Sequence, residues 1–288
     1  MKILITGSDG AIGREIASHL KKLKFNLILH TKKKNKKNSK YYFFCNDLSK
    51  KIELKDAPQI IIHCASANKN SYDLNAKINL RKNIDITKNI INYANSNNVK
   101  KIFFFSSVDA YGLTKKKVIS ENHTSKNLSS YGKAKLISEK LFCKNINKFK
   151  VICFRIPGVL TVFKNKQKPI LLKIVDKMVN GKKVEVYNSN SLFNNVIDVH
   201  EISKIIRALI QKNIKKNDVY NLSATEPLKF LNIIKILKKK TKYKKNIIIR
   251  NNRDKSFTIN NNKLTKQFDI NISTTRKIVK RFLNKYLI

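Results

Sequence analysis

The sequence is poor in acidic residues, cysteine, glycine and proline. Its 288 residues include 18 Asp and Glu, 4 Cys, 7 Gly, 4 Pro and no Trp. The cysteines are Cys45, Cys64, Cys143 and Cys153, and they include no closely spaced pair of the kind that binds a metal. Such sparse cysteines exclude a disulfide-rich secreted scaffold and indicate reduced structural thiols. We therefore expect neither disulfides nor a metal site.

Long hydrophobic runs are also absent. No segment approaches the roughly 18 apolar residues that a membrane-spanning helix needs. Residues 1–7 lead directly into a glycine-containing turn, without the apolar core and small-residue cleavage site of a signal peptide. We therefore expect a cytoplasmic protein that does not associate with a membrane.

The shortage of acids leaves 62 Lys and Arg and a formal net charge of +44. Such a charge is typical of proteins that bind nucleic acids. However, only eight of the basic residues are Arg, and the lysine runs at 32–37, 115–117 and 238–240 contain no aromatic residue that could stack on bases. A composition-wide lysine bias, such as an AT-rich genome produces, explains the excess more simply, so we expect no specific nucleic-acid partner. The charge should still attract anionic substrates and cofactors at low salt.

Short apolar segments alternate with helical segments over the first 158 residues. The strand-like segments are 2–6, 25–29, 41–45, 59–64, 102–105 and 151–155, and the helix-like segments are 14–23, 74–95 and 129–142. Strands that alternate with helices form parallel sheets with right-handed crossovers. The pattern predicts an α/β fold built on a Rossmann-type doubly wound parallel sheet.

Beyond residue 158 the pattern becomes mixed. It predicts helices at 170–179, 201–211, 230–237 and 278–283, a strand pair with a turn over 181–187, and a strand at 219–222. We expect 1–158 to form the sheet domain, with 196–223 returning to it, while 159–195 and 224–288 form a smaller mixed substrate-binding lobe. The segments 32–40 and 238–246 are rich in lysine and asparagine, and we expect them to be solvated loops or helix ends.

A glycine-rich turn joins the first predicted strand to the first predicted helix. Gly7, Gly10 and Gly13 permit a tight turn and let the backbone approach a pyrophosphate at the helix N-terminus. A tight turn without a ligand has the same pattern. After the second strand, His30 and Lys32 flank the place where NAD-binding proteins usually carry Asp or Glu, and a basic residue there suits the 2′-phosphate of NADP.

Tyr131 and Lys135 stand four residues apart and share one face of a predicted helix. A phenol with a pKa of about 10 is a poor base at neutral pH, and a nearby ammonium lowers that pKa. Ser107 follows the apolar segment 102–105, at the carboxyl end of a parallel strand, where open α/β sheets bind their ligands. The three side chains are therefore candidates to meet over one carbonyl or alcohol oxygen. The alternative is an ordinary surface helix that carries a tyrosine and lysines.

In this order the motifs resemble the extended short-chain dehydrogenase/reductases, which include sugar-nucleotide epimerases, dehydratases and 4-keto reductases. The matching segments span nearly the whole chain and are 6–13, 46–48, 61–66, 105–112, 131–135, 155–158, 195–199 and 219–222, together with Asn83. The resemblance implies an NAD(P)-dependent oxidoreductase or epimerase that acts on a nucleotide-activated sugar for polysaccharide biosynthesis. It also implies that residues 1–158 form the NAD(P)-binding Rossmann domain.

The resemblance gives each matched residue an expected role. Tyr131 would be the acid/base, Lys135 would hold the nicotinamide ribose and lower the pKa of Tyr131, and Ser107 would orient the reacting oxygen. Asp47 would meet the adenine, and Asn83 would steady the cofactor side of the site. The cofactor is expected to be NADP or NAD, with NADP favoured, bound by Gly7, Asp9, Gly10, Ile12, Gly13, His30, Lys32, Asp47, Leu48, Ala65, Ser66, Asn83, Tyr131, Lys135 and Ile156.

Departures from the family pattern narrow the reaction. Family dehydratases usually carry an acid pair directly after the Ser/Thr position, or one acid a residue further on. Val108 occupies the first of these places and cannot protonate a leaving hydroxyl, so dehydration is disfavoured against reduction or epimerisation, although Asp109 in the second place leaves it open. Ile86 replaces a frequent glycine and is expected to alter packing against the cofactor. Two alternatives stay open: a non-catalytic dinucleotide-binding or nucleic-acid-associated protein, and the same chemistry on a non-sugar carbonyl substrate. Family members often form homodimers through the helices that correspond to 74–95 and 129–142.

Overall fold

The computed structural model describes residues 1–23, 25–32, 42–54, 56–67, 76–123, 126–144, 149–163, 168–250 and 256–287. The chain divides into two compact units. Unit 1 comprises Met1–Leu113, Thr124–Arg155 and Ile206–Tyr220, and unit 2 comprises Thr114–His123, Ile156–Ile205 and Asn221–Ile288. Four segments that were expected in the sheet domain belong to unit 2, and they are 114–123, 156–158, 196–205 and 221–223.

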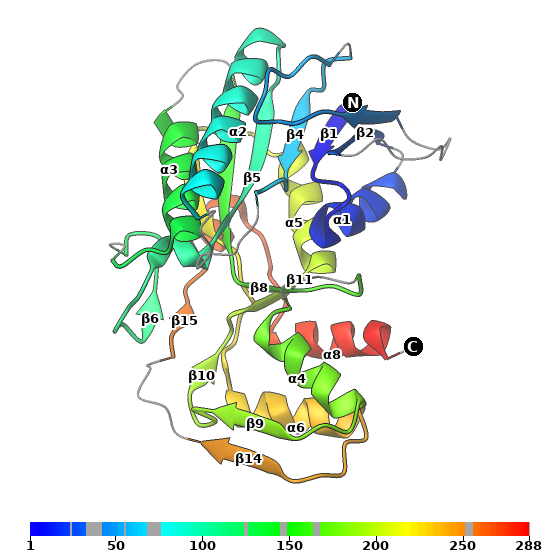
Figure 1. Cartoon of the computed structure of the whole chain (residues 1–288), viewed down its shortest axis with the longest axis vertical. Coiled ribbons are helices and arrows are strands. Elements are labelled where there is room, and N and C mark those ends of the chain that lie inside the picture. Colours follow the sequence, from blue (N-terminus) through cyan, green and yellow to red (C-terminus); the bar gives the residue numbers. More distant parts are fainter. Residues whose placement is uncertain are drawn as a thin grey trace. The chain divides into compact units, whose positions relative to one another are not determined.

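Unit 1 is built on a seven-stranded sheet (Figure 1). In chain order its strands are β1 (Lys2–Thr6), β2 (Asn26–Thr31), β3 (Tyr42–Cys45), β4 (Ile60–His63), β5 (Lys101–Ser107), β7 (Lys150–Ile156) and β12 (Asp218–Asn221). In space they follow the order β12-β7-β5-β4-β1-β2-β3. The pairs β1/β2, β1/β4, β2/β3 and β4/β5 are parallel. The strand order runs outward from β1 in both directions, so the predicted doubly wound α/β fold is confirmed.

The central strands consist almost entirely of apolar residues because helices cover both faces of the sheet. Helices α2 (Ala76–Ser96) and α3 (Ser130–Lys144) lie together on one side, and α1 (Ala11–Lys21) lies on the other (Figure 1). Alternate strand residues such as Leu4, Ile61 and Phe104 join Ile90 and Phe142 in one buried cluster. The carboxyl ends of the strands are thereby held on rigid elements, which suits a ligand site at that edge.

Unit 2 is mixed, as the sequence indicates. Its helices are α4 (Ile170–Val179), the first part of α5 (Val199–Gln211), α6 (Phe230–Lys240), α7 (Asn262–Phe268) and α8 (Thr275–Tyr286). Its short strands pair as β6 (Val118–Ile119) with β15 (Thr258–Ile259), β8 (Gly158–Leu160) with β11 (Val196–Asp198), β9 (Val184–Tyr187) with β14 (Ile247–Arg250), and β10 (Leu192–Phe193) with β13 (Leu228–Lys229). The β6/β15 pairing explains why residues 114–123 belong to this unit.

One local prediction is wrong. The sequence predicted a strand pair with a turn over 181–187, but this segment holds the single strand β9. Its parallel partner is β14, about sixty residues further along the chain. A turn between two strands is a local signal, whereas this pairing joins distant segments that local patterning does not connect. Residues 33–40, and the predicted start of the second helix at 74–75, lie outside the described residues.

Two further findings concern the described part of the chain. None of its helices has the length and apolarity to cross a bilayer. Within the same ranges, no group of three or more His, Cys, Asp or Glu side chains is arranged to hold a metal ion.

Candidate functional site

The turn between β1 and α1 requires glycine at two places. Gly7 has a φ of +66°, and a Cβ there would lie 2.8 Å from the Ala65 backbone. A Cβ at Gly13 would lie 2.5 Å from the Gly7 carbonyl oxygen. Gly10 has room by comparison and precedes α1 in extended conformation, with no side-chain cap. The N-terminus of α1 therefore meets the cleft without a side chain over it, which suits an anionic group.

A cleft of about 570 Å³ opens above this turn. It brings together the predicted cofactor residues Gly7, Asp9, Gly10, His30, Lys32, Asp47, Leu48, Ala65 and Ser66, and it is also lined by Thr31, Asn46, Cys64, Ala67, Asn79, Lys82 and Ile86. Of the other predicted residues, Ile12, Gly13, Asn83, Tyr131 and Lys135 belong to the same unit but do not line this cleft, and Ile156 belongs to unit 2. The glycine turn, the small residues after β4 and the open helix N-terminus fit a dinucleotide.

The imidazole of His30 is buried and hydrogen-bonded to the backbone of its own unit. It is 4% exposed, with Nδ1 3.3 Å from the Gly7 backbone N–H and Nε2 2.9 Å from the Asn46 carbonyl oxygen. Because Nδ1 accepts from an N–H, Nε2 carries the proton and donates it to Asn46. Burial lowers the pKa of His30, although the Asn46 bond and nearby carboxylates oppose this. A neutral, fully bonded imidazole is not a partner for a 2′-phosphate, so the sequence-based candidate His30 instead ties β2 to the glycine turn and to the end of β3.

Asp47 lies between two lysines in the wall of the cleft. Lys82 donates to its carboxylate at 3.1 Å, and Lys32 approaches to 3.7 Å. Partial burial would raise the pKa of Asp47, but hydrogen bonds from Ser49 and the Lys82 ammonium lower it well below its ordinary value. Lys82 was not predicted from the sequence, because one lysine in a lysine-rich chain carries no signal by itself. The end of β2 therefore has two ammonium groups and an ionised carboxylate.

Asn83 holds the loop that follows β4. Its Oδ1 accepts hydrogen bonds from Ser66 Oγ at 3.0 Å and from the Ala67 N–H at 2.9 Å. One turn later Thr87 donates to the Asn83 carbonyl and shares a 2.7 Å hydrogen bond with Ser138 of α3. These contacts connect the wall of the cleft through α2 to the helix that carries Tyr131.

Ser107, Tyr131 and Lys135 are contributed by β5 and by one face of α3. Ser107 is 7% exposed, and its Oγ accepts a 3.1 Å hydrogen bond from the Asp109 N–H, which begins the 3-10 turn η1 (Val108–Tyr111). Lys135 is 5% exposed and its Nζ donates to the Phe105 carbonyl at 2.8 Å. The same Nζ lies 5.5 Å from the centroid of the Tyr131 ring. A Cβ at Gly132 would collide with the Asp109 carbonyl, so glycine lets η1 pack directly on α3.

The pKa of Tyr131 moves in the opposite direction to the sequence-based expectation. Burial raises it, the Asp109 carboxylate raises it further, and a hydrogen bond with Ser66 only partly offsets these effects. Lys135 Nζ donates to the Phe105 carbonyl and lies 5.5 Å from the centroid of the Tyr131 ring, and its charge does not reverse the balance. Tyr131 is therefore a protonated phenol at neutral pH. That Asp109 acts on it electrostatically was not foreseen from the sequence.

The buried side chain of His63 lies near Lys135, and both contact the ring of Phe104. His63 is 2% exposed, bonds through Nδ1 to Thr6 Oγ1 at 2.7 Å, and stacks on Phe104 with centroids 5.5 Å apart. Burial and the nearby Lys135 charge lower its pKa to about 3. The neutral ring adds no second positive charge beside Lys135, and we assign it a packing role.

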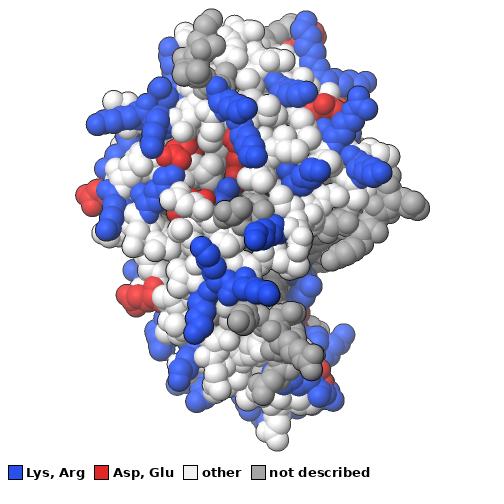
Figure 2. Space-filling model, turned by 90° about the vertical axis from the view of Figure 1, so that its left-hand side faces the viewer, with Lys and Arg blue, Asp and Glu red and all other residues white. Residues whose placement is uncertain are grey.

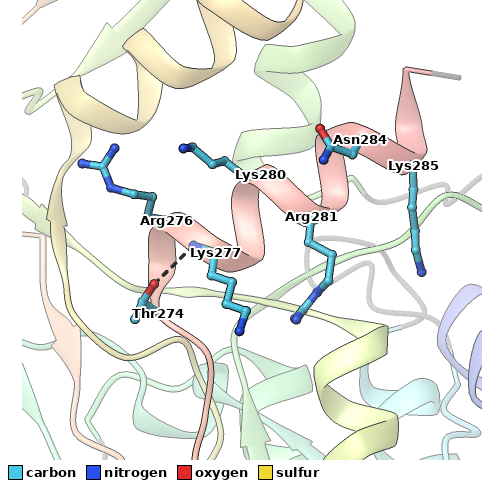
Figure 3. Close-up of a pocket in the computed structure, with 7 residues that line it drawn as sticks. All are labelled: Thr274, Arg276, Lys277, Lys280, Arg281, Asn284 and Lys285. Atoms are coloured by element: carbon cyan, nitrogen blue, oxygen red, sulfur yellow. Dashed lines mark hydrogen bonds between the residues drawn. The ribbon is translucent and has the colours of Figure 1, made fainter.

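Lysine and arginine side chains are scattered over the face of the molecule in Figure 2, with few acidic ones among them. One concentration lies on α8, where an open hollow is lined by Thr274, Arg276, Lys277, Lys280, Arg281, Asn284 and Lys285 (Figure 3). Thr274 caps this helix by accepting from the Lys277 N–H, and Arg281 is bound to Asp198 and Glu201. Among the residues that the structure describes, those lining the hollow all come from the segment 274–285, so this part of the chain forms a charged helix face.

Unit 2 also contains an apolar groove of about 190 Å³. It is lined by Ile170, Ile174, Glu185, Val186, Tyr187, Asn188, Ser191, Leu192, Phe193, Phe230 and Ser256. The rings of Phe193 and Phe230 lie 5.2 Å apart, while Tyr187 and Leu192 are each about half exposed. Aromatic side chains beside a few polar ones in the wall of a groove suit a planar ring with polar edges.

Comparisons with known proteins agree with this geometry. A sequence model of the NAD dependent epimerase/dehydratase family matches residues 3–223. The uncharacterized protein MJ1055 of Methanocaldococcus jannaschii is 25% identical over 265 residues, which cover 82% of this chain and 80% of that protein. Among solved structures, the ADP-L-glycero-D-manno-heptose-6-epimerase of Helicobacter pylori has a TM-score of 0.84 at 19% identity, covering 99% of this chain and 96% of that one.

Two other solved structures have the same fold. The UDP-glucose 4-epimerase of Thermotoga maritima, solved with UDP-glucose, has a TM-score of 0.77 at 18% identity, with both chains fully covered. WbmH of Bordetella bronchiseptica, solved with NAD+, has a TM-score of 0.78 at 16% identity and covers 99% of each chain. These likenesses show the fold, and the match over residues 3–223 shows the family. The chain is a member of the NAD-dependent epimerase/dehydratase family.

Proposed function

We propose that this chain is an NAD(P)-dependent oxidoreductase or epimerase that acts on a nucleotide-activated sugar, with Tyr131 exchanging the proton. One observation carries the proposal. Ser107 of β5 and Tyr131 and Lys135 of α3 are all present, and Tyr131 is hydrogen-bonded to Ser66, which lines the dinucleotide-sized cleft. A binding-only protein has no need of all three side chains.

In this proposal each side chain has a separate task. A bound nicotinamide cofactor supplies or accepts the hydride at a sugar carbon. The Tyr131 hydroxyl gives its proton to the oxygen of the ketone, or takes it back from the alcohol, and Ser107 Oγ orients that oxygen by a hydrogen bond. Lys135, fixed on the Phe105 carbonyl, adds positive charge beneath the ring of Tyr131.

The protonated phenol of Tyr131, hydrogen-bonded to Ser66 of the cleft, is the form that ketone reduction uses. A phenol that stays protonated at neutral pH is ready to donate to a developing alkoxide but is a poor base for an alcohol. Reduction of a 4-keto sugar, or the reductive half of an epimerisation, uses the donating form. We therefore propose a 4-keto reductase first and an epimerase second. Dehydration is disfavoured because Val108 cannot protonate a leaving hydroxyl.

We further propose that the apolar groove of unit 2 takes the nucleobase of the substrate. Tyr187, Phe193 and Phe230 offer flat surfaces for stacking, and the positive charge of the chain favours a diphosphate. Substitution of Phe193 by Ala should raise KM for the nucleotide sugar with little effect on dinucleotide affinity.

The decisive experiment supplies the purified protein with NADPH or NADH and with a set of nucleotide-linked 4-keto sugars and sugars. Consumption of reduced nicotinamide indicates a reductase, and inversion at one carbon without net cofactor consumption indicates an epimerase. Turnover of non-sugar ketones alone would replace the sugar-nucleotide assignment. Tight dinucleotide binding without any turnover would support the non-catalytic alternative. The homodimer through α2 and α3 stays a prediction for sedimentation analysis.

For the cofactor we propose NADP over NAD. The residues that directly follow β2 in the sequence, Lys32–Lys34, include no acid that could receive the ribose hydroxyls. Lys32 and Lys82, which flank Asp47 in the cleft, offer positive charge to a 2′-phosphate. The neighbour WbmH was solved with NAD+, and we propose that the two lysines give this chain the other preference.

Replacing Lys32 by Glu should lower NADPH affinity about tenfold or more while leaving NADH affinity nearly unchanged, because one charge-assisted bond to the phosphate is lost and a repulsion is gained. Fluorescence titration with both reduced cofactors measures this. Lys100→Glu is the matched control, since Lys100 is exposed at the amino end of β5. Equal loss for both cofactors would contradict the proposed role of Lys32.

A further inference from the structure

A buried ion pair lies directly beside the residues proposed to carry the chemistry. Glu139 of α3 and Arg155 of β7 are 2% and 6% exposed. Arg155 binds Glu139 through two hydrogen bonds, Nε to Oε1 at 2.9 Å and Nη2 to Oε2 at 2.7 Å. Burial disfavours the charge of Arg155, but its bonds to Glu139 still raise the pKa of Arg155. The two side chains form a bidentate ion pair within the core of unit 1.

Ser106 and Tyr111 also contact the pair. Ser106 Oγ donates to the Oε1 atom of Glu139. The guanidinium carbon of Arg155 lies 4.4 Å from the centroid of the Tyr111 ring. The four side chains come from β5, α3, β7 and η1, so one charged cluster joins every element that presents Ser107, Tyr131 or Lys135.

Stability alone does not explain such a pair. Removing two charges from water costs several kcal/mol each, and apolar side chains of similar volume often stabilise a core as well or better. Such a pair instead fixes one arrangement of its neighbours, because the bidentate geometry tolerates little displacement. What it fixes here is the geometry of the proposed site.

The contacts lead from the pair to the reacting groups. Ser106, held by Glu139, adjoins Ser107, whose Oγ starts η1 by accepting from the Asp109 N–H. Tyr111, beneath Arg155, ends η1. On α3, Tyr131, Lys135 and Glu139 follow at intervals of four and share one face. Displacement of Glu139 would shift both Ser107 and the helix face that carries Tyr131.

We propose that Glu139 and Arg155 are a positioning pair that sets the distance and angle between Ser107 and Tyr131. The expected loss of kcat rests on the proposed function, whereas the expected displacement of Ser107 and Tyr131 does not. Glu139 is not itself a catalytic residue, since its carboxylate is occupied by Arg155 and Ser106.

The test is Glu139→Gln, which keeps the size of the side chain and an acceptor for Ser106 but removes the charge. We expect kcat to fall roughly ten- to hundredfold, because misplacement of a reacting group by about 1 Å costs that much. KM for the cofactor and the dinucleotide Kd should stay within about twofold. Arg155→Lys, which keeps the positive charge without the bidentate fork, should give the same kcat loss.

The matched control is Glu201→Gln in unit 2. Glu201 is fully buried and binds Arg281 at 2.7 Å and the Ser273 N–H at 3.1 Å, so it loses a comparable ion pair. It should lower the Tm without a selective loss of kcat. Equal kcat losses in both variants, or an unchanged kcat in Glu139→Gln, would overturn the proposal.

A double variant separates positioning from stability. Glu139→Leu with Arg155→Met should regain the Tm of the wild type, as apolar replacements of buried pairs do, but not its kcat. Recovery of kcat as well would show that the site needs only a well-packed core at this place.

Nuclear magnetic resonance tests the proposal without enzymatic turnover. The signal is the 13C resonance of the Tyr131 ring carbon that bears the hydroxyl, which Tyr131→Phe identifies by removing it. It should shift in Glu139→Gln and not in Glu201→Gln, and an unshifted resonance would overturn the proposal. If the wild type turned over no substrate, the proposed function would fail while this resonance still decided the inference.

Discussion

Replacing Tyr131 by Phe should lower kcat by about a hundred- to ten-thousandfold, the range that general acid–base groups contribute. The substitution removes only the phenol oxygen, so the ring keeps its contact with Lys135. The hydrogen bond with Ser66 is lost, but Ser66 keeps its bond to Asn83 and the cleft wall stays in place. Dinucleotide Kd should therefore change little. Steady-state kinetics and a fluorescence titration of the same preparation test both statements.

Tyr93→Phe is a suitable control for this variant. Tyr93 lies on α2 in the same unit, is 5% exposed, and burial raises its pKa to about 12. Its hydroxyl has no hydrogen-bond partner among the described residues. Loss of that hydroxyl should leave kcat unchanged. Wild-type kcat in Tyr131→Phe would exclude the proton-transfer role, and a similar loss in both variants would point to a general effect of buried phenols.

Replacing Gly10 by Val should weaken dinucleotide binding by at least about a hundredfold while the protein stays folded. The first side-chain carbon would lie 3.2 Å from the Gly7 carbonyl oxygen, so a small shift accommodates it. The branched side chain would then occupy the part of the cleft at the N-terminus of α1, where the pyrophosphate is expected. Two or more charge-assisted bonds from backbone N–H groups would be lost, which accounts for the magnitude.

Gly13→Val separates loss of binding from loss of structure. A Cβ at Gly13 would lie 2.5 Å from the Gly7 carbonyl oxygen, so this variant should lower the Tm markedly. Gly10→Val should keep a Tm close to that of the wild type. Calorimetry and equilibrium titration with NADPH give both quantities. Undiminished NADPH affinity in folded Gly10→Val would refute the pyrophosphate site at this turn.

Local patterns predicted the sheet unit well. The bounds predicted for the strands at 2–6, 102–105 and 151–155 and for the helix at 129–142 lie within two residues of the observed ones. In unit 2, the helix predicted at 170–179 has the bounds of α4. The segments of the sheet unit are long or strongly apolar, and the covered faces of a parallel sheet give them an unambiguous pattern. The short strands β6, β8, β10, β13, β14 and β15 were not predicted. Each depends on a partner elsewhere in the chain, so its own few residues carry little information.

The site was predicted unevenly for the same reason. The glycine spacing belongs to a single turn, and the four-residue step from Tyr131 to Lys135 belongs to a single helix, so the sequence alone determined both. The sequence also determined the order of strands and helices, and with it the fold class. The tertiary structure decided what depends on distant neighbours. It buries His30 between two backbone groups, places Lys82 on Asp47, and seals the Glu139–Arg155 pair in the core. It also raises the pKa of Tyr131, because desolvation and the position of Asp109 are set by packing and not by spacing along the chain.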